Sequence, residues 1–210
     1  MDFWDIAYQS LLLVTFIFSL RLVNQKKFKI FPYLLGITNF VELFIFFIKH
    51  ENPEYPILYH FYIPIEYCLL AYFYYRITDI GWGKRFAFYS IFGLPLICIF
   101  ISFNINPFKF PTLQFNVAGV CLIILALISI FSIMPEESSS IWTHPVFIIN
   151  IGILVFYSGN LLLMGVYNYL RDFNLELAKS LFRAINTSLN FVMYLMFITA
   201  FVCLSRTRKL

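Results

Sequence analysis

The chain has 210 residues, of which 61% are hydrophobic, 21% aromatic and only 12% charged. A soluble domain has about 25% charged residues, so this composition leaves too little polar surface to cover a soluble globule and predicts a polytopic membrane protein. The net charge of +4 does not indicate nucleic-acid binding, because the basic residues stand in short clusters between apolar segments.

Seven apolar segments, each bounded by charged residues, Pro or Asn, have a suitable length for helices that cross a bilayer. The connections between them are short, so we expect one domain, residues 1–210, with an all-α fold and no extramembrane domain. The N-terminal sequence MDFWD is acidic, unlike a signal peptide, and we expect the first segment to be retained as a span. The expected spans are Ile6–Val23, Ile30–Ile48, Pro56–Tyr75, Phe86–Phe103, Leu113–Met134, Pro145–Tyr167 and Leu181–Leu204.

Lys and Arg residues are distributed unequally between the two sides of this seven-span arrangement. Cytoplasmic loops of membrane proteins carry an excess of Lys and Arg, so we expect the N-terminus outside and the C-terminus in the cytoplasm. The protein is then a multi-pass protein of the plasma membrane. The richer side has ten basic residues, Arg21, Lys26, Lys27, Lys29, Arg76, Lys84, Arg85, Arg206, Arg208 and Lys209, and the other has five, Lys49, Lys109, Arg171, Lys179 and Arg183.

The third segment carries Glu66 near its middle. An ionised side chain at the bilayer centre costs at least about 2.5–3.5 kcal/mol on insertion scales, so such a residue usually faces a protein interior or a wet cavity. Tyr59 and Tyr62, seven and four residues before Glu66, share its side of the helix. His60 lies about 120° away from Glu66 around the helix axis.

Further polar side chains occur inside other spans. The second has Asn39 and Glu42, the sixth has Asn160, and the seventh carries a polar stripe that includes Arg183 and Asn190. A rise of about 1.5 Å per residue puts Asn190 roughly 15 Å from the outer end of its helix, level with the glutamate of the third span. We expect these groups to line a polar cavity open to the outside. The candidate ligand- or proton-binding residues are Glu42, Glu66, His60, Asn39, Asn160, Asn190, Arg183, Tyr59 and Tyr62.

Each of these signals also has a purely structural interpretation. A lone Glu in a span can be a protonated acid bonded to a neighbouring helix, and Asn residues often join helices through hydrogen bonds. Arg183 can extend to the outer interface or pair with Glu42 or Glu66. The sequence leaves both interpretations open.

Several activities of helical membrane proteins require residues that this sequence lacks. All eight lysines lie at span ends or in loops, which argues against a retinal protein. His60 and Glu66 are the only plausible metal-binding pair at depth, short of the ligand set of a catalytic zinc site, and the four cysteines have no CxxC spacing. The sequence contains no GxSxG or nucleotide-binding motif. We predict no catalytic residue, no metal and no cofactor, and nothing in the sequence supports enzyme activity.

Two stretches, YHFYIPIEYCLLAYFYY at 59–75 and HPVFIINIGILVFYSGNLLLM at 144–164, look like recurring segments of a family of small, uncharacterised bacterial seven-span proteins. That family resembles the membrane-sensing modules of bacterial histidine kinases. The resemblance implies a sensor or accessory role in the bacterial inner membrane and identifies no catalytic residue. Because the chain has no kinase domain, signalling would need a partner.

The sequence therefore favours an integral membrane sensor or accessory subunit that binds a small ligand, lipid or proton in an outward-facing cavity and signals to a partner. The expected partners are the lipid bilayer and a membrane or cytoplasmic signalling protein, with a homo-oligomer as a further option. Other interpretations stay open: a proton- or cation-coupled transporter or channel, an oligomerising effector that disrupts membranes, and an intramembrane lipid enzyme.

Overall fold

The computed structural model describes residues 3–48, 56–104, 109–133 and 141–206, and the structural statements below concern those residues. Their regular structure is entirely helical, which confirms the all-α prediction. Each expected span overlaps one α-helix, although several helix ends differ from the expected ones. The elements are α1 (Phe3–Ser19), η1 (Leu20–Leu22), α2 (Ile30–Ile48), α3 (Ile57–Ile77), α4 (Gly81–Asn104), α5 (Thr112–Ser132), η2 (Ile141–Thr143), α6 (Pro145–Phe173) and α7 (Leu175–Arg206), where η marks a short 3-10 turn.

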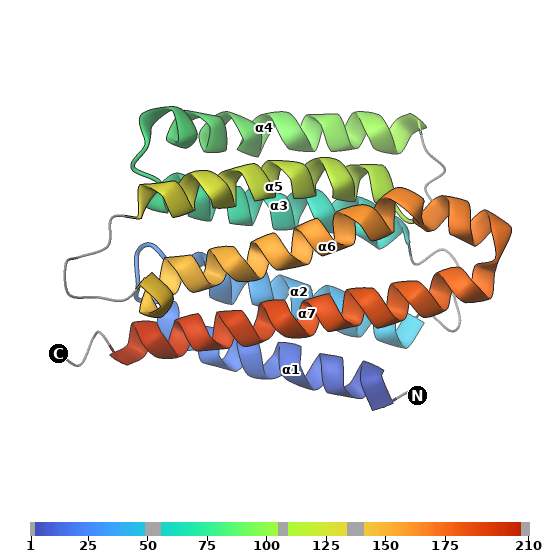
Figure 1. The fold of residues 1–210 in the computed structure, drawn as a ribbon, viewed down its shortest axis with the longest axis horizontal. Coiled ribbons are helices and arrows are strands. Elements are labelled where there is room, and N and C mark those ends of the chain that lie inside the picture. The colour runs from blue at the N-terminus through green and yellow to red at the C-terminus, as the bar shows by residue number, and fades with distance from the viewer. Residues whose placement is uncertain (1–2, 49–55, 105–108, 134–140, 207–210) are drawn as a thin grey trace.

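Consecutive α-helices run antiparallel, so α1 begins at one end of the bundle and α7 finishes at the other (Figure 1). We call these the N-terminal end and the C-terminal end of the bundle. α1 packs against α2, α2 against α3, α3 against α5, α5 against α6, α6 against α7, and α7 against α1, which closes a ring. α4 lies outside this ring, against α3 and α5. Helices that are distant in sequence, such as α1 and α7, therefore enclose a common interior.

Aromatic rings fill the C-terminal half of this interior. Phe31 of α2 is fully buried and packs edge-on against Phe73 of α3 and against Phe197 and Phe201 of α7, with ring centroids 4.9 to 5.4 Å apart. Such edge-to-face pairs contribute about 0.5–1.5 kcal/mol beyond the burial of their area. These contacts join α2, α3 and α7 across the interior.

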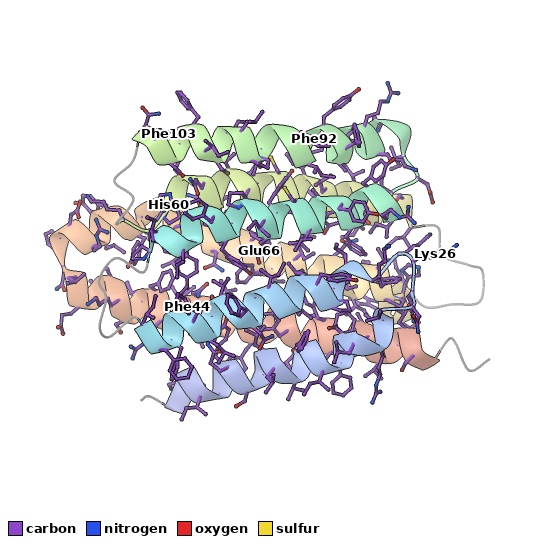
Figure 2. The ribbon with its side chains drawn as sticks, turned by 180° about the vertical axis from the view of Figure 1, so that it is seen from behind. Lys26, Phe44, His60, Glu66, Phe92 and Phe103 are labelled. Carbon is purple, nitrogen blue, oxygen red and sulfur yellow. The ribbon has the colours of Figure 1, made fainter. Side chains whose placement is uncertain are left out.

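Large apolar side chains cover the outer surface of the bundle. Phe92, Phe100 and Phe103 of α4 have 62%, 70% and 86% of their surface exposed, and Figure 2 shows Phe92 and Phe103 on this helix at the edge of the bundle. Soluble monomers rarely expose contiguous apolar surface on this scale. Five helices are long and apolar enough to cross a membrane, which indicates a multi-pass membrane protein: Ile30–Ile48, Gly81–Asn104, Thr112–Ser132, Pro145–Phe173 and Leu175–Ser205.

α1 and α3 fall outside that set for different reasons. The apolar part of α1, Ile6–Leu22, is shorter than the others. α3 has 21 residues, but it carries Glu66 together with a histidine and several tyrosines. Apart from Arg76 in its last turn, its exposed positions are nevertheless apolar, with Ile57, Phe61 and Ile65 at 38%, 67% and 46% exposure. The low hydropathy of α3 therefore comes from the side chains that it turns toward other helices.

The connection between the last two expected spans is helical, which corrects the loop expected at 168–180. α6 continues to Phe173 and α7 begins at Leu175, and the hairpin projects beyond the ends of the other helices (Figure 1). Oδ1 of Asn174 accepts a hydrogen bond of 3.0 Å from the backbone N–H of Leu177 and so caps the first turn of α7. The polar residues at 168–180 therefore belong to a helical hairpin and not to a loop.

α6 and α7 approach each other closely because glycines of α6 face α7. A Cβ atom added at Gly152 would lie 3.0 Å from Cβ of Met196, and one added at Gly159 would lie 2.7 Å from a methyl group of Leu189. Small residues at such positions let helix backbones come together in membrane proteins. The two glycines thus serve helix packing.

Candidate functional site

Two glutamates from neighbouring helices lie in the same part of the ring interior. Glu42 of α2 and Glu66 of α3 are both partly buried, and their carboxyl groups lie within electrostatic range of each other. Figure 2 shows Glu66 between α3 and α2. The hydroxyl group of Tyr59 donates a hydrogen bond of 3.3 Å to Oε1 of Glu42. The structure thus brings together three of the residues that the sequence indicated.

Tyrosines from four helices surround these carboxyl groups. The phenol groups of Tyr62 and Tyr157 face the carboxyl group of Glu66. Tyr194 lies within electrostatic range of both carboxyl groups, and its ring centroid is 6.2 Å from that of Tyr8, which itself lies within range of the α2 carboxyl group. We call this set the acidic cluster; it consists of Glu42, Glu66, Tyr8, Tyr59, Tyr62, Tyr157 and Tyr194.

No basic side chain among the described residues faces Glu66. Its titratable neighbours are Glu42, Tyr62, Tyr157 and Tyr194, and phenol groups are neutral donors and acceptors. Two carboxylates held away from bulk water lose hydration and repel each other. A proton or a small cation that neutralises one of them would therefore stabilise the cluster.

The acidic cluster is not sealed. Both glutamates and Tyr8 keep part of their surface accessible, whereas Tyr157 and Tyr194 are only 3% exposed. The two glutamates and Tyr8 are therefore less enclosed than the tyrosines that α6 and α7 contribute.

His60 belongs to a different polar network, on the side of α3 that faces α4 and α5. Its Nε2 atom donates to the carbonyl oxygen of Lys109 (3.1 Å), and its Nδ1 atom lies 3.0 Å from Oγ of Ser102. Because a carbonyl oxygen only accepts, Nε2 carries the proton and Nδ1 accepts. Gln114 donates to the carbonyl oxygen of Cys98 (2.8 Å) and to Ser102. These bonds tie three helices together, and they do not bring His60 to Glu66.

The three predicted asparagines use their amide donors on backbone carbonyl groups. Asn39 donates to the carbonyl oxygen of Leu12 in α1 (3.4 Å), Asn160 to that of Phe156 (3.1 Å), and Asn190 to a carbonyl group of its own helix (2.9 Å). The amide N–H groups of these asparagines thus form hydrogen bonds within or between helices. The amide oxygens of Asn39 and Asn160 are buried and have no hydrogen-bond partner among the described residues.

A second buried network joins α3, α5 and α6 in the C-terminal half of the bundle. The hydroxyl group of Tyr74 donates to Oδ1 of Asn150 (2.9 Å), and Nδ2 of Asn150 donates to Oγ of Ser129 (3.0 Å). The donors and acceptors are matched within the protein. This triad is a structural link between helices.

Two hollows lie near the surface, and neither is lined by the acidic cluster. One of about 280 Å³ is at the C-terminal end, and one of about 740 Å³ lies between α1 and α7 toward the N-terminal end. Arg183 is exposed and lines the larger one. The residues of the smaller hollow are Lys27, Phe28, Ile77, Asp79, Ser129, Ser132, Ile133, His144, Pro145, Val146 and Leu204.

Sequence reasoning did not assign Tyr8, Tyr157 and Tyr194 to the candidate site. Tyr157 and Tyr194 stand among polar residues of their spans, but one tyrosine among the 14 of the chain is a weak signal. Tyr8 is followed by Gln9 and Ser10 near the start of the first span, where polar residues are common and do not mark a site. Their place beside the carboxyl groups depends on how α1, α6 and α7 are rotated in the ring.

No family model, no curated protein and no solved structure matches the chain. Within the described residues, no group of three or more His, Cys, Asp and Glu side chains is arranged to hold a metal ion.

Proposed function

We propose that the protein crosses the membrane with all seven α-helices, with its N-terminus outside and its C-terminus in the cytoplasm. Support comes from the apolar outer faces of the helices, including that of α3, where Arg76 in the last turn is the exposed charged residue. The C-terminal end also carries more exposed basic residues than the N-terminal end, as the positive-inside rule requires. These are Arg21, Lys26, Lys27, Lys29, Arg76, Lys84 and Arg85; Lys49, Arg208 and Lys209 lie outside the described residues.

We further propose that the protein is a membrane sensor or accessory subunit that takes up a proton or a small cation at the acidic cluster. The observation that carries this proposal is the convergence of two carboxyl groups and five phenol groups from α1, α2, α3, α6 and α7, with no basic side chain facing Glu66 in the described part of the chain. Neutralising one carboxylate removes repulsion between α2 and α3.

Signalling follows from the position of the cluster. Its members belong to five of the helices that form the ring, so a change of charge there alters the packing of helices that are distant in sequence. Packed interiors respond by switching between discrete arrangements and not by continuous deformation. The basic loops at the C-terminal end would pass the change to a partner protein.

The test replaces Glu66 by Gln, which is close in shape to the protonated acid. The full chain, purified in detergent, is followed by the near-ultraviolet circular dichroism of its tyrosines from acidic to neutral pH. We expect a pH-dependent signal in the wild type and its loss in Glu66→Gln. Asp172→Asn, which changes an exposed carboxyl group on the α6–α7 hairpin, should keep the wild-type response.

A Glu66→Gln variant with an unchanged pH response would refute the proposed site.

Reconstitution of the protein in liposomes distinguishes a sensor from a transporter. Proton or cation flux that requires Glu66 would favour a transporter over a sensor.

A further inference from the structure

The larger hollow is a groove between the first half of α7 and the start of α1. Its volume of about 740 Å³ lies within the roughly 300–1,000 Å³ range of sites for small organic ligands. From residue 176 to residue 191 it follows α7 for about 22 Å at the usual helical rise. Its lining residues are Trp4, Glu176, Lys179, Ser180, Arg183, Ala184, Thr187, Ser188 and Phe191.

Polarity changes along the groove in one direction. The part nearest the α6–α7 hairpin is charged, with Lys179 and Arg183 against a single acid, Glu176. The part deeper along α7 is lined by small or hydroxyl-bearing residues and ends at Phe191, with the indole ring of Trp4 at its side. The basic side chains thus lie about 12 to 18 Å along α7 from Phe191, and a cationic end followed by an uncharged end matches an elongated amphiphile with a negatively charged head.

We propose that this groove binds one membrane lipid with an anionic headgroup. The headgroup lies at Lys179 and Arg183, and an acyl chain follows Ala184 toward Phe191. The proposal rests on the membrane-spanning part of the proposed function, because the hairpin that projects beyond the other helices then lies at headgroup level. Tryptophan prefers that level of the bilayer, which agrees with Trp4 at the side of the groove.

The lipid site adjoins the acidic cluster through the same two helices. Trp4 lies one helical turn before Tyr8 on α1, and Phe191 lies about one turn before Tyr194 on α7. The rings of Tyr8 and Tyr194 are 6.2 Å apart within the cluster. A lipid that holds α1 and α7 at a fixed separation therefore also sets the separation of these two tyrosines.

The experiment uses Trp4 as the reporter of the groove. The two other tryptophans, Trp82 and Trp142, are 62% and 72% exposed, so each can be replaced by Phe with little cost to folding. The full-length chain with Trp4 alone is placed in nanodiscs in which brominated phosphatidylglycerol or brominated phosphatidylcholine is diluted into unlabelled phosphatidylcholine. Bromine quenches indole fluorescence on contact. We expect the anionic lipid to quench Trp4 at lower mole fractions than the zwitterionic lipid does.

Charge removal in the groove tests the assignment of the headgroup. Lys179→Gln and Arg183→Gln should each lower the preference for phosphatidylglycerol by about fivefold, the usual contribution of one basic residue at an anionic surface. Arg171→Gln, at the same end of the bundle but outside the groove, is the matched control and should keep the preference.

Equal quenching by the two lipids would overturn the proposal, and so would a preference that survives both groove substitutions. A chain that does not enter nanodiscs would refute membrane spanning instead. A reconstituted chain that shows the pH response but no lipid preference would refute the lipid site alone. The proposed role of the acidic cluster would be unaffected.

Discussion

Replacing Asn150 by Leu distinguishes the structural polar contacts from the acidic cluster. The substitution removes the acceptor of the Tyr74 hydroxyl group (2.9 Å) and the donor to Ser129 (3.0 Å), and all three side chains are almost fully buried. A hydrogen bond inside a membrane protein contributes about 0.6 kcal/mol on average and up to about 1.7. A buried partner left unpaired costs about 1–3 kcal/mol. We therefore expect Asn150→Leu to lower the free energy of unfolding by roughly 1–3 kcal/mol.

Reversible unfolding in mixed micelles, followed by far-ultraviolet circular dichroism during titration with dodecyl sulfate, measures this loss. A double-mutant cycle of Asn150→Leu with Tyr74→Phe should give a coupling free energy of about 0.6–1.7 kcal/mol. Asn104→Leu is the control, because Asn104 is exposed and its amide donates to a carbonyl group of its own helix (2.8 Å). Additive losses in the cycle would refute the direct bond. Loss of the pH response in Asn150→Leu with unchanged stability would show that the triad belongs to the functional site.

Two substitutions in the packing of the bundle give further expected outcomes. Gly152→Leu places a side chain where Cβ alone would already lie 3.0 Å from Met196, so it should separate α6 from α7 and lower the free energy of unfolding by about 1–3 kcal/mol in the same titration; unchanged stability would contradict the close approach of these helices. Phe31→Ala removes a fully buried ring that contacts Phe73 and Phe197, and its expected loss is about 3–5 kcal/mol. A loss below about 1 kcal/mol would show that this ring does not join the two sides of the interior.

The sequence allowed each polar residue inside a span to be either a structural link between helices or part of a binding site. In the structure these residues fall into two groups. His60 and the three predicted asparagines have their donors engaged by backbone carbonyl groups, as expected for links within and between helices. Glu42 and Glu66 instead are partly buried among phenol groups. Sequence periodicity correctly indicated that His60 and Glu66 lie on different sides of α3. It could not identify the helices that each side meets.

The helical segments of this protein are specified locally, by apolar runs that are bounded by charge, Pro or Asn and that need no distant contact to form helices. The largest departure from the expected boundaries is between α6 and α7, where polar residues form a capped helical hairpin and not the loop that their polarity suggested. α4 also begins at Gly81, five residues before the expected Phe86. The ring of α1, α2, α3, α5, α6 and α7, with α4 outside it, was decided by tertiary packing. That packing also placed Tyr8, Tyr157 and Tyr194 around Glu66, because the azimuth of each helix depends on the neighbours that its side chains meet and not on its own composition.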